Sequence, residues 1–219
     1  MSLFRLDASI RTEGSVSREV ADTVEKAWRA EHPHAPVIRR DLGLEPLPAT
    51  AWRDAVSAGR TPAEERTPQQ AEASALSDAL VSELLDAEAY LFAVPLYNYG
   101  VPQHVKAWID MILADPRGTS TDSPLLAGRP GVLVLARGGG YGPGTPREGW
   151  DHAGPYLQRI FSEVWGMDLH VAEAELTLAG VVPAMASLIG LADQSLRDAH
   201  LTADSHGRTI AERVRAAAA

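Results

Sequence analysis

Short apolar runs alternate with amphipathic stretches along the chain, and this alternation predicts its secondary structure. Two of the runs are continuous, AYLFAV at residues 89–94 and GVLVLA at residues 131–136. Such runs are typical of parallel strands that are covered on both faces. Further strands are expected at Leu3 to Ala8, Val37 to Asp41 and Leu169 to Ala174. Five strands separated by helices predict an α/β protein with a doubly wound parallel sheet of order 2-1-3-4-5 and helices on both faces.

The stretches between the expected strands carry helix signals. Val16 to Ala30 follows the first strand and is expected to be the first helix. The segment TPQQ at residues 67–70 combines a capping box with proline at the first helical position, which predicts a helix N-terminus. Apolar side chains repeat at helical spacing from Leu157 to Val164, and Gly166 is expected to end that helix.

Three less regular segments complete the chain. A long connection after the second strand is expected to hold a short helix from Thr50 to Ser57. Pro183 is expected to open the last major helix, with Leu196 on its apolar face. Arg208 to Ala219 is expected to be a separate terminal helix or a frayed tail. At 219 residues, the chain (1–219) is expected to form a single domain.

Composition narrows the classes of function. The formal net charge of −9 opposes binding to nucleic acid, and the sequence has no basic stripe to offset it. The absence of cysteine excludes disulfides, thiol nucleophiles and thiolate metal sites, and it fits a reducing, cytoplasmic location. No N-terminal signal peptide and no apolar run long enough to cross a membrane are present, so we expect no membrane partner.

A hydroxyl-rich loop follows the first strand. Ser9, Ser15 and Ser17 surround the start of the first helix, where exposed amides and the helix dipole attract anions. The loop lacks the glycine and lysine pattern of a P-loop and the glycines of a dinucleotide fold, which favours a mononucleotide phosphate. The alternative is that Ser15 is simply an N-cap.

Two further unusual loops follow the third and fourth strands. PLYNYGVP at residues 95–102 holds two tyrosines that can flank a planar ligand and an asparagine that can bond to a ring edge. ARGGGYGPG at residues 136–144 has three consecutive glycines, which let the backbone approach a ligand closely. The alternatives are a turn with aromatic packing and a flexible loop. Because ligands bind beyond the carboxyl ends of parallel strands, the three loops are expected at one edge of the sheet.

At these residues the sequence resembles the FMN-dependent NADH-azoreductase family, also described as FMN-dependent NADH:quinone oxidoreductases. The family's S-x5-S-x-S phosphate loop is similar to Ser9, Ser15 and Ser17. Its P-[ML]-Y-N-[FW] segment resembles residues 95–99, which lead to Lys106 on an amphipathic stretch. Its [ST]-R-G-G segment resembles residues 136–139, with alanine in place of the hydroxyl residue.

The resemblance implies a flavodoxin-like homodimer with FMN at the subunit interface. It also implies ping-pong transfer of two electrons from NADH, or from NADPH, to quinones or azo compounds. By position, the residues implied to bind FMN are Ser9, Arg11, Ser15, Val16, Ser17, Pro95, Leu96, Tyr97, Asn98, Tyr99, Arg137, Gly138, Gly139 and Gly140. Arg11 departs from the family pattern, and it either pairs with the FMN phosphate or reaches solvent.

No side-chain nucleophile is required in this interpretation, because the flavin carries the chemistry. Tyr99, Tyr141 and Trp150 are candidate walls of the acceptor pocket, with ordinary packing as the alternative. The seven histidines form no recognisable ligand set, so no metal is expected; His104 and His152 either line the acceptor pocket or face solvent.

Two other functions remain open from the sequence. One is a specialised reductase of a polycyclic, polyketide-like quinone, which the unusual glycine- and proline-rich segment at residues 140–150 makes plausible. The other is a flavodoxin-like electron carrier that passes single electrons to a protein partner. The sequence does not identify the physiological acceptor, the preference between NADH and NADPH, or the dimer geometry.

Overall fold

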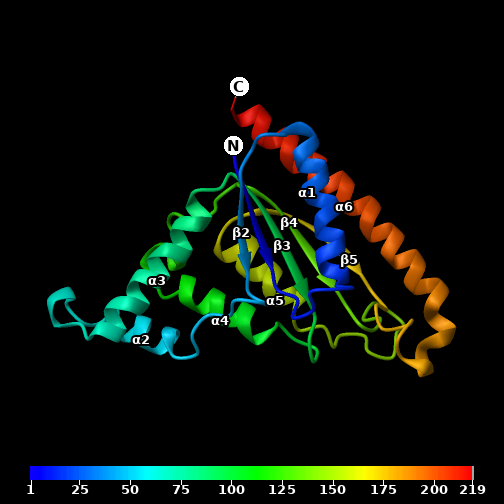
Figure 1. Cartoon of the computed structure of the whole chain (residues 1–219), viewed down its shortest axis with the longest axis horizontal. Coiled ribbons are helices and arrows are strands. Elements are labelled where there is room, and N and C mark those ends of the chain that lie inside the picture. Colours follow the sequence, from blue (N-terminus) through cyan, green and yellow to red (C-terminus); the bar gives the residue numbers. More distant parts are fainter. Residues whose placement is uncertain (219) are drawn as a thin grey trace.

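The computed structural model describes residues 1–218 and consists of a five-stranded parallel sheet between two helical layers (Figure 1). The strand order is β2-β1-β3-β4-β5, as the sequence predicts. The strands are β1 (Leu3–Asp7), β2 (Val37–Asp41), β3 (Ala89–Pro95), β4 (Pro130–Ala136) and β5 (Asp168–Ala174). Each lies within one residue of its expected bounds. The strands β3 and β4 coincide with the two continuous apolar runs, which mark strands buried on both faces.

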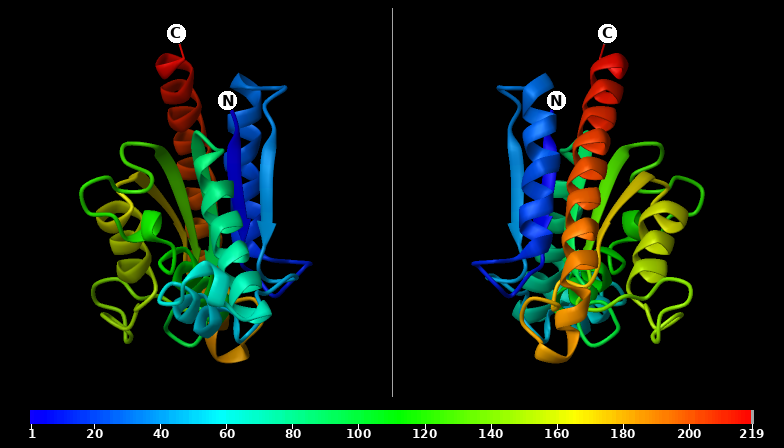
Figure 2. Two further views of the ribbon diagram at one scale, coloured as in Figure 1. Left: turned by 90° about the vertical axis from the view of Figure 1, so that its left-hand side faces the viewer. Right: turned by 90° about the vertical axis from the view of Figure 1, so that its right-hand side faces the viewer.

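Helices cover both faces of the sheet. The α-helices are α1 (Val16–Glu31), α2 (Ala51–Ala58), α3 (Pro68–Leu85), α4 (Gln103–Ile112), α5 (Gly154–Gln158) and α6 (Ile189–Ala217). Shorter turns are η1 (Ala63–Glu65), η2 (Pro116–Thr119), η3 (Arg159–Val164) and η4 (Pro183–Leu188). α1 and α6 run side by side on one face, and α3, α4 and α5 cover the other (Figures 1 and 2).

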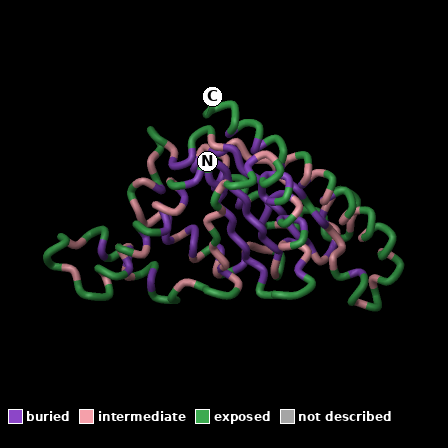
Figure 3. The backbone as a smooth tube through the Cα atoms, turned by 45° about the horizontal axis from the view of Figure 1, so that its top comes forward, coloured by how far each residue is buried: buried purple, intermediate pink, exposed green. Residues whose placement is uncertain are grey.

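The sheet divides the core into two clusters, and buried residues are concentrated in the middle of the molecule (Figure 3). The strands β1, β3 and β4 are buried along their whole length, whereas the edge strands β2 and β5 are mostly of intermediate burial. On the α3–α5 side, aromatic rings stack in a continuous group: Phe92 lies 4.3 Å from Phe161 and 6.1 Å from Trp108, between ring centroids. Each fully buried ring contributes roughly 1.5–3 kcal/mol through removal from water. This packing makes the sheet a rigid platform for the loops at its carboxyl edge.

Local sequence signals explain several helix ends. The Thr67 side chain accepts a hydrogen bond from the Gln70 amide, and the Gln70 side chain accepts one from the Thr67 amide, which completes the predicted capping box. The helix expected from Leu157 onward becomes π-helical in η3. It ends at Val164, and Gly166 follows with a φ of 74°, in the left-handed region that favours glycine.

The C-terminal region differs from the expectation. Pro183 opens the short 3-10 turn η4, and α6 begins only at Ile189. The separate terminal helix or tail expected from Arg208 is instead the end of α6, which is continuous to Ala217; Ala219 lies outside the described residues. Gly207 lies inside α6 without interrupting it, and the lack of a side chain there serves the packing of α6 against α1. A Cβ there would lie 2.7 Å from the Val24 carbonyl oxygen of α1, so glycine allows the two helices to approach closely.

Within residues 1–218, the structure contains no helix that is both long enough and apolar enough to span a bilayer.

Candidate cofactor site

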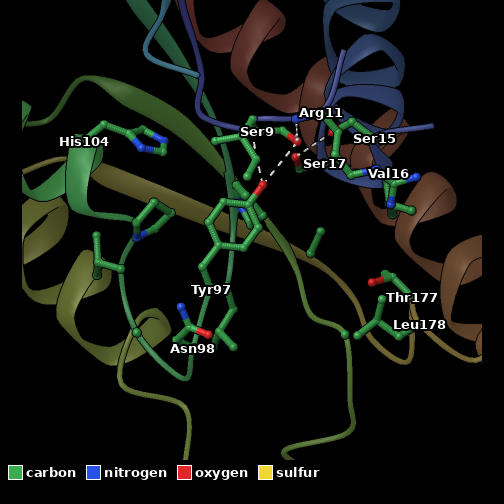
Figure 4. Close-up of a pocket in the computed structure, with 18 of the residues that line it drawn as sticks. Ser9, Arg11, Ser15, Val16, Ser17, Tyr97, Asn98, His104, Thr177 and Leu178 are labelled. Carbon is green, nitrogen blue, oxygen red and sulfur yellow. Dashed lines mark hydrogen bonds between the residues drawn. The ribbon is translucent and has the colours of Figure 1, made fainter. Parts of the chain in front are cut away.

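One large cavity opens at the carboxyl edge of the sheet, where all three predicted loops meet (Figure 4). Its volume is about 780 Å³, within the range of about 300–1,000 Å³ that is typical of small-molecule sites. The structure therefore brings together residues that are far apart in sequence. The predicted residues that line the cavity are Ser9, Arg11, Ser15, Val16, Ser17, Pro95, Leu96, Tyr97, Asn98 and Gly138.

The N-terminus of α1 forms one end of this cavity. Ser15 occupies the N-cap position, but its side chain makes no capping hydrogen bond and lies 3.3 Å from the Ser17 hydroxyl. Ser15 is therefore the N-cap residue of α1, without the side-chain hydrogen bond that an ordinary serine cap makes. The first amides of a helix have no partner within the helix, and here they open beside buried hydroxyls of Ser9, Ser15 and Ser17. Together with the helix dipole, this arrangement suits a phosphate group.

A partly buried ion pair between Arg18 and Asp41 supports the hydroxyl-rich loop at residues 9–17. Arg18 donates hydrogen bonds to the Ser9 carbonyl oxygen at 2.8 Å and to Asp41 at 2.6 and 2.8 Å. Burial raises the pKa of Asp41, but the Arg18 guanidinium and two backbone amides outweigh it and leave that pKa below its ordinary value. Gly43 completes the support: a Cβ there would lie 2.0 Å from the Ser9 carbonyl oxygen. The loop therefore has little freedom to shift.

Tyr97 connects the first two loops. Its hydroxyl accepts a hydrogen bond from the Ile10 amide at 3.2 Å and lies 3.5 Å from the Ser9 hydroxyl. The next two residues, Asn98 and Tyr99, have left-handed backbones with φ of 49° and 68°. Such a conformation costs an L-residue about 1–2 kcal/mol, and it persists where surrounding structure enforces it. The turn thus holds Asn98 at the cavity and directs Tyr99 away from it.

The glycine-rich loop is paired with a segment that sequence analysis missed. The amides of Thr177 and Leu178 donate to the carbonyl oxygens of Arg137 at 3.0 Å and Gly138 at 3.3 Å. A Cβ on Gly138 would lie 2.7 Å from the end of the Leu178 side chain, so a larger residue here would displace that side chain. Both Thr177 and Leu178 line the cavity. The sequence signal that could have identified these two residues is their position just after the fifth strand, at the same edge of the sheet as the three predicted loops.

Arg137 does not line the cavity with its side chain. Its buried guanidinium forms ion pairs with Asp151 at 3.0 Å, with Glu175 at 3.1 Å and with Glu173. Glu175 also accepts a hydrogen bond from the Tyr141 amide at 3.0 Å. Arg137 therefore ties the ends of β4 and β5 to the loop at residues 138–153.

A second cavity of about 280 Å³ adjoins the first. The two share Leu96, Asn98, Gly138 and Leu178 as lining residues, and the smaller one adds Tyr99, Gly139, Tyr141, Arg147, Val182 and Met185. Of the predicted residues, Arg137, Gly140 and Trp150 line neither cavity. The Trp150 ring packs edge-on against Tyr99, with 5.5 Å between ring centroids, and the side chain is 51% exposed. Trp150 thus supports one wall from outside.

The two histidines left open by the sequence have different positions. His104, at the start of α4, lines the larger cavity, and its Nε2 lies 2.7 Å from the Ala8 carbonyl oxygen. His152 lines neither cavity, and its amide donates to the Tyr99 carbonyl oxygen at 2.9 Å. In the part of the chain that the structure describes, no group of three or more His, Asp or Glu side chains is arranged to hold a metal ion.

The residues present fit a phosphorylated planar group. Buried hydroxyls and unpartnered helix amides lie at one end of the larger cavity. The other end has apolar side chains, the Asn98 amide and closely approaching backbone at Gly138. A mononucleotide with a flat heterocycle has complementary chemistry at both ends.

Comparison with known protein families agrees with this geometry. The family described as "Flavodoxin-like fold" matches residues 1–182. A protein of Parafrankia sp. (strain EAN1pec), named FMN-dependent NADH:quinone oxidoreductase, is 40% identical over 204 residues, covering 92% of this chain and 96% of the relative. A protein of Streptomyces avermitilis with the same name is 37% identical over 213 residues, covering 97% of this chain and 98% of the relative.

Solved structures have the same fold. An azoreductase from Bacillus anthracis str. Sterne superposes with a TM-score of 0.79 at 20% identity, covering 95% of this chain and 99% of that one. An FMN-dependent NADH-azoreductase from Bacillus anthracis str. Ames Ancestor, solved in complex with FMN, gives a TM-score of 0.76 at 16% identity, covering 96% and 99%.

Proposed function

This chain belongs to the flavodoxin-like family of FMN-dependent NADH:quinone oxidoreductases, and from that premise we propose that it binds FMN in the larger cavity and reduces quinones or azo compounds with NADH. The observation that carries the proposal is the meeting of three separate loops around one cavity with hydroxyls at one end and apolar walls at the other. A structural scaffold has no need of such an arrangement.

The phosphate of FMN binds at the N-terminus of α1 in this proposal. Ser9, Ser15 and Ser17 donate hydroxyl hydrogen bonds, and the backbone amide of Val16 adds a further donor. Arg11 is exposed at the cavity rim and, among residues 1–218, has no carboxylate partner. We assign it to the phosphate, because an otherwise unpaired guanidinium beside a phosphate forms strong charge-assisted hydrogen bonds.

The ring system binds between the second and third loops. Residues 95–98 and Gly138 line this part of the larger cavity, and Tyr99 and Gly139 line the adjoining smaller one. Arg137 acts by holding its loop in place through Glu173 of β5 and Glu175 just after it. Bound FMN supplies the two-electron redox chemistry, and this chain's residues bind it, orient it and exclude water.

The smaller cavity provides the place for donor and acceptor. Its volume of about 280 Å³ suits one ring system at a time, and it shares a wall with the larger cavity at Gly138 and Leu178. In this proposal the nicotinamide of NADH leaves before the acceptor enters, so ping-pong kinetics are expected. Tyr99 and Tyr141 form aromatic walls against which either ring packs.

We propose that a homodimer forms through the apolar surface beside this cavity. Val181 is 70% exposed and Leu191 is 61% exposed, close in sequence to Val182 and Met185, which line the smaller cavity. A second copy of the chain would cover this surface and close the site. Light scattering tests it: Leu191→Asp is expected to favour the monomer, whereas Leu201→Asp, farther along α6 and 72% exposed, is not. Equal behaviour of the two variants would contradict the interface.

Anaerobic spectroscopy with the FMN-loaded protein tests the proposed function. NADH is expected to bleach the flavin absorption, and a simple quinone is expected to restore it over many cycles. Initial rates at several quinone concentrations are expected to give parallel double-reciprocal lines. A protein that takes up no FMN, or is reduced but sustains no turnover with any quinone or azo compound, would contradict the proposal. The second outcome would favour the electron carrier instead.

A further inference from the structure

Arg147 has a defined place at the smaller cavity. Its guanidinium carbon lies 5.8 Å from the centroid of the Tyr99 ring, in a cation–π arrangement. Its Nη1 atom lies 3.1 Å from the point that a Cβ on Gly139 would occupy, so it approaches the glycine-rich loop closely. The guanidinium is therefore held between the two loops that form the cavity walls.

The positive charge of Arg147 is not neutralised by the protein. Neighbouring carboxylates have other partners: Glu148 accepts from the Gly144 amide at 2.8 Å, and Asp151 and Glu175 pair with Arg137. Among residues 1–218, Arg147 forms no ion pair, although carboxylates outnumber cations in the chain. It is also the one charged residue among the described residues that line this cavity.

The other walls of the cavity are apolar or aromatic. Tyr99, Tyr141, Leu178, Val182 and Met185 suit a flat hydrophobic ring. A guanidinium at the edge of such a pocket matches a planar anionic group attached to that ring, because it can donate two parallel hydrogen bonds to a carboxylate or sulfonate. Partial exclusion of water by the ring strengthens the interaction.

We propose that Arg147 makes this enzyme select aromatic acceptors that carry an anionic substituent, such as a carboxylate or sulfonate, over neutral acceptors of the same size. The proposal rests on the proposed function, since it places the acceptor in the smaller cavity. With a formal net charge of −9, the protein as a whole repels anions, so a single unpaired cation at the site has a disproportionate effect on which acceptors approach. The same chemistry could serve a phosphate of NADH, and the experiment separates the two.

The kinetic test compares two acceptors with one ring system, 1,4-naphthoquinone and its 2-sulfonate, in the FMN-loaded protein. Arg147→Met is expected to lower kcat/KM for the sulfonate roughly tenfold or more, which corresponds to one charged hydrogen bond. The neutral quinone is expected to change by less than about threefold. Arg147→Lys keeps the charge and is expected to recover part of the loss. Arg159→Met, which removes a cation from the exposed surface of η3, is the matched control.

A binding measurement makes the test independent of turnover. Calorimetry on the oxidised, FMN-loaded protein is expected to show that 2-naphthalenesulfonate binds more tightly than the neutral 2-naphthalenesulfonamide, and that Arg147→Met removes the difference. Equal losses for both acceptors, or unchanged sulfonate binding in the variant, would overturn the proposal. A change confined to the KM for NADH would overturn it in favour of the donor phosphate. Lack of turnover with both quinones in the unaltered protein would instead contradict the proposed function, while the binding comparison would still decide the role of Arg147.

Discussion

Replacing Ser17 with alanine tests the assignment of the phosphate end of the cavity. The Ser17 side chain is buried, with 1% of its surface exposed, and its hydroxyl has one weak contact, with Ser15 at 3.3 Å. Because so little holds this hydroxyl in the protein alone, its removal is expected to change the free energy of unfolding of the apoprotein only slightly. Its proposed partner is a charged phosphate, and a hydrogen bond to a charged group contributes about 1.5–3 kcal/mol.

That free energy sets the expected change in affinity. At about 1.4 kcal/mol for each factor of ten, Ser17→Ala is expected to weaken FMN binding roughly tenfold to a hundredfold. Quenching of FMN fluorescence on titration with apoprotein measures the dissociation constant directly. Riboflavin, which has the same ring system without the phosphate, is expected to bind the variant and the unaltered protein equally.

The comparison of the two ligands decides the result. Ser77→Ala is the matched control, because Ser77 is buried in α3, far in sequence from the cavity, and donates to the Met111 carbonyl oxygen at 2.7 Å. It is expected to lower stability without changing FMN affinity. If Ser17→Ala weakens riboflavin as much as FMN, the hydroxyl acts on the ring or on the fold, and the phosphate assignment is wrong.

Three further predictions concern other parts of the fold. Gly43→Ala places a methyl group against the Ser9 carbonyl oxygen. It is expected to lower the free energy of unfolding by about 1–3 kcal/mol, measured by denaturation, and to weaken FMN binding, measured by titration. An unchanged FMN affinity would show that the loop tolerates displacement. Burial, with His170 stacked at 4.8 Å, lowers the pKa of His206 from its ordinary 6.5. The unfolded chain therefore binds more protons than the folded one, and the free energy of unfolding is expected to fall as the pH drops below about 7. His206→Asn should flatten this pH dependence in urea melts, and an unaltered slope would refute the role of His206. Thr67→Ala is expected to lower the free energy of unfolding by about 1 kcal/mol in the same assay while FMN binding stays unchanged, and no loss of stability would mean that the capping box contributes nothing.

Several features of the fold followed from local patterns. The apolar run at residues 131–136 predicted β4 to within one residue, and the TPQQ segment predicted the start of α3, because burial on both faces and capping are short-range effects. The long C-terminal helix was less predictable. By its local sequence, Gly207 is expected to weaken a helix. Its function is instead to let α1 pack closely, at Ala27, which lies 180 residues earlier in the chain.

The candidate site also has features that the sequence determined and features that depend on the tertiary structure. The sequence by itself determined that Ser15, Asn98 and Gly138 reach the same edge of the sheet, because parallel strands place their carboxyl ends together. Only the tertiary structure decided which side chains face the cavity. Arg137 turns away because three carboxylates surround it, Glu173 in β5, Glu175 just after β5 and Asp151 in the loop before α5, while Arg147 is left unpaired at the smaller cavity. Side-chain direction depends on partners that are distant in sequence, and the pattern along one strand or loop does not contain them.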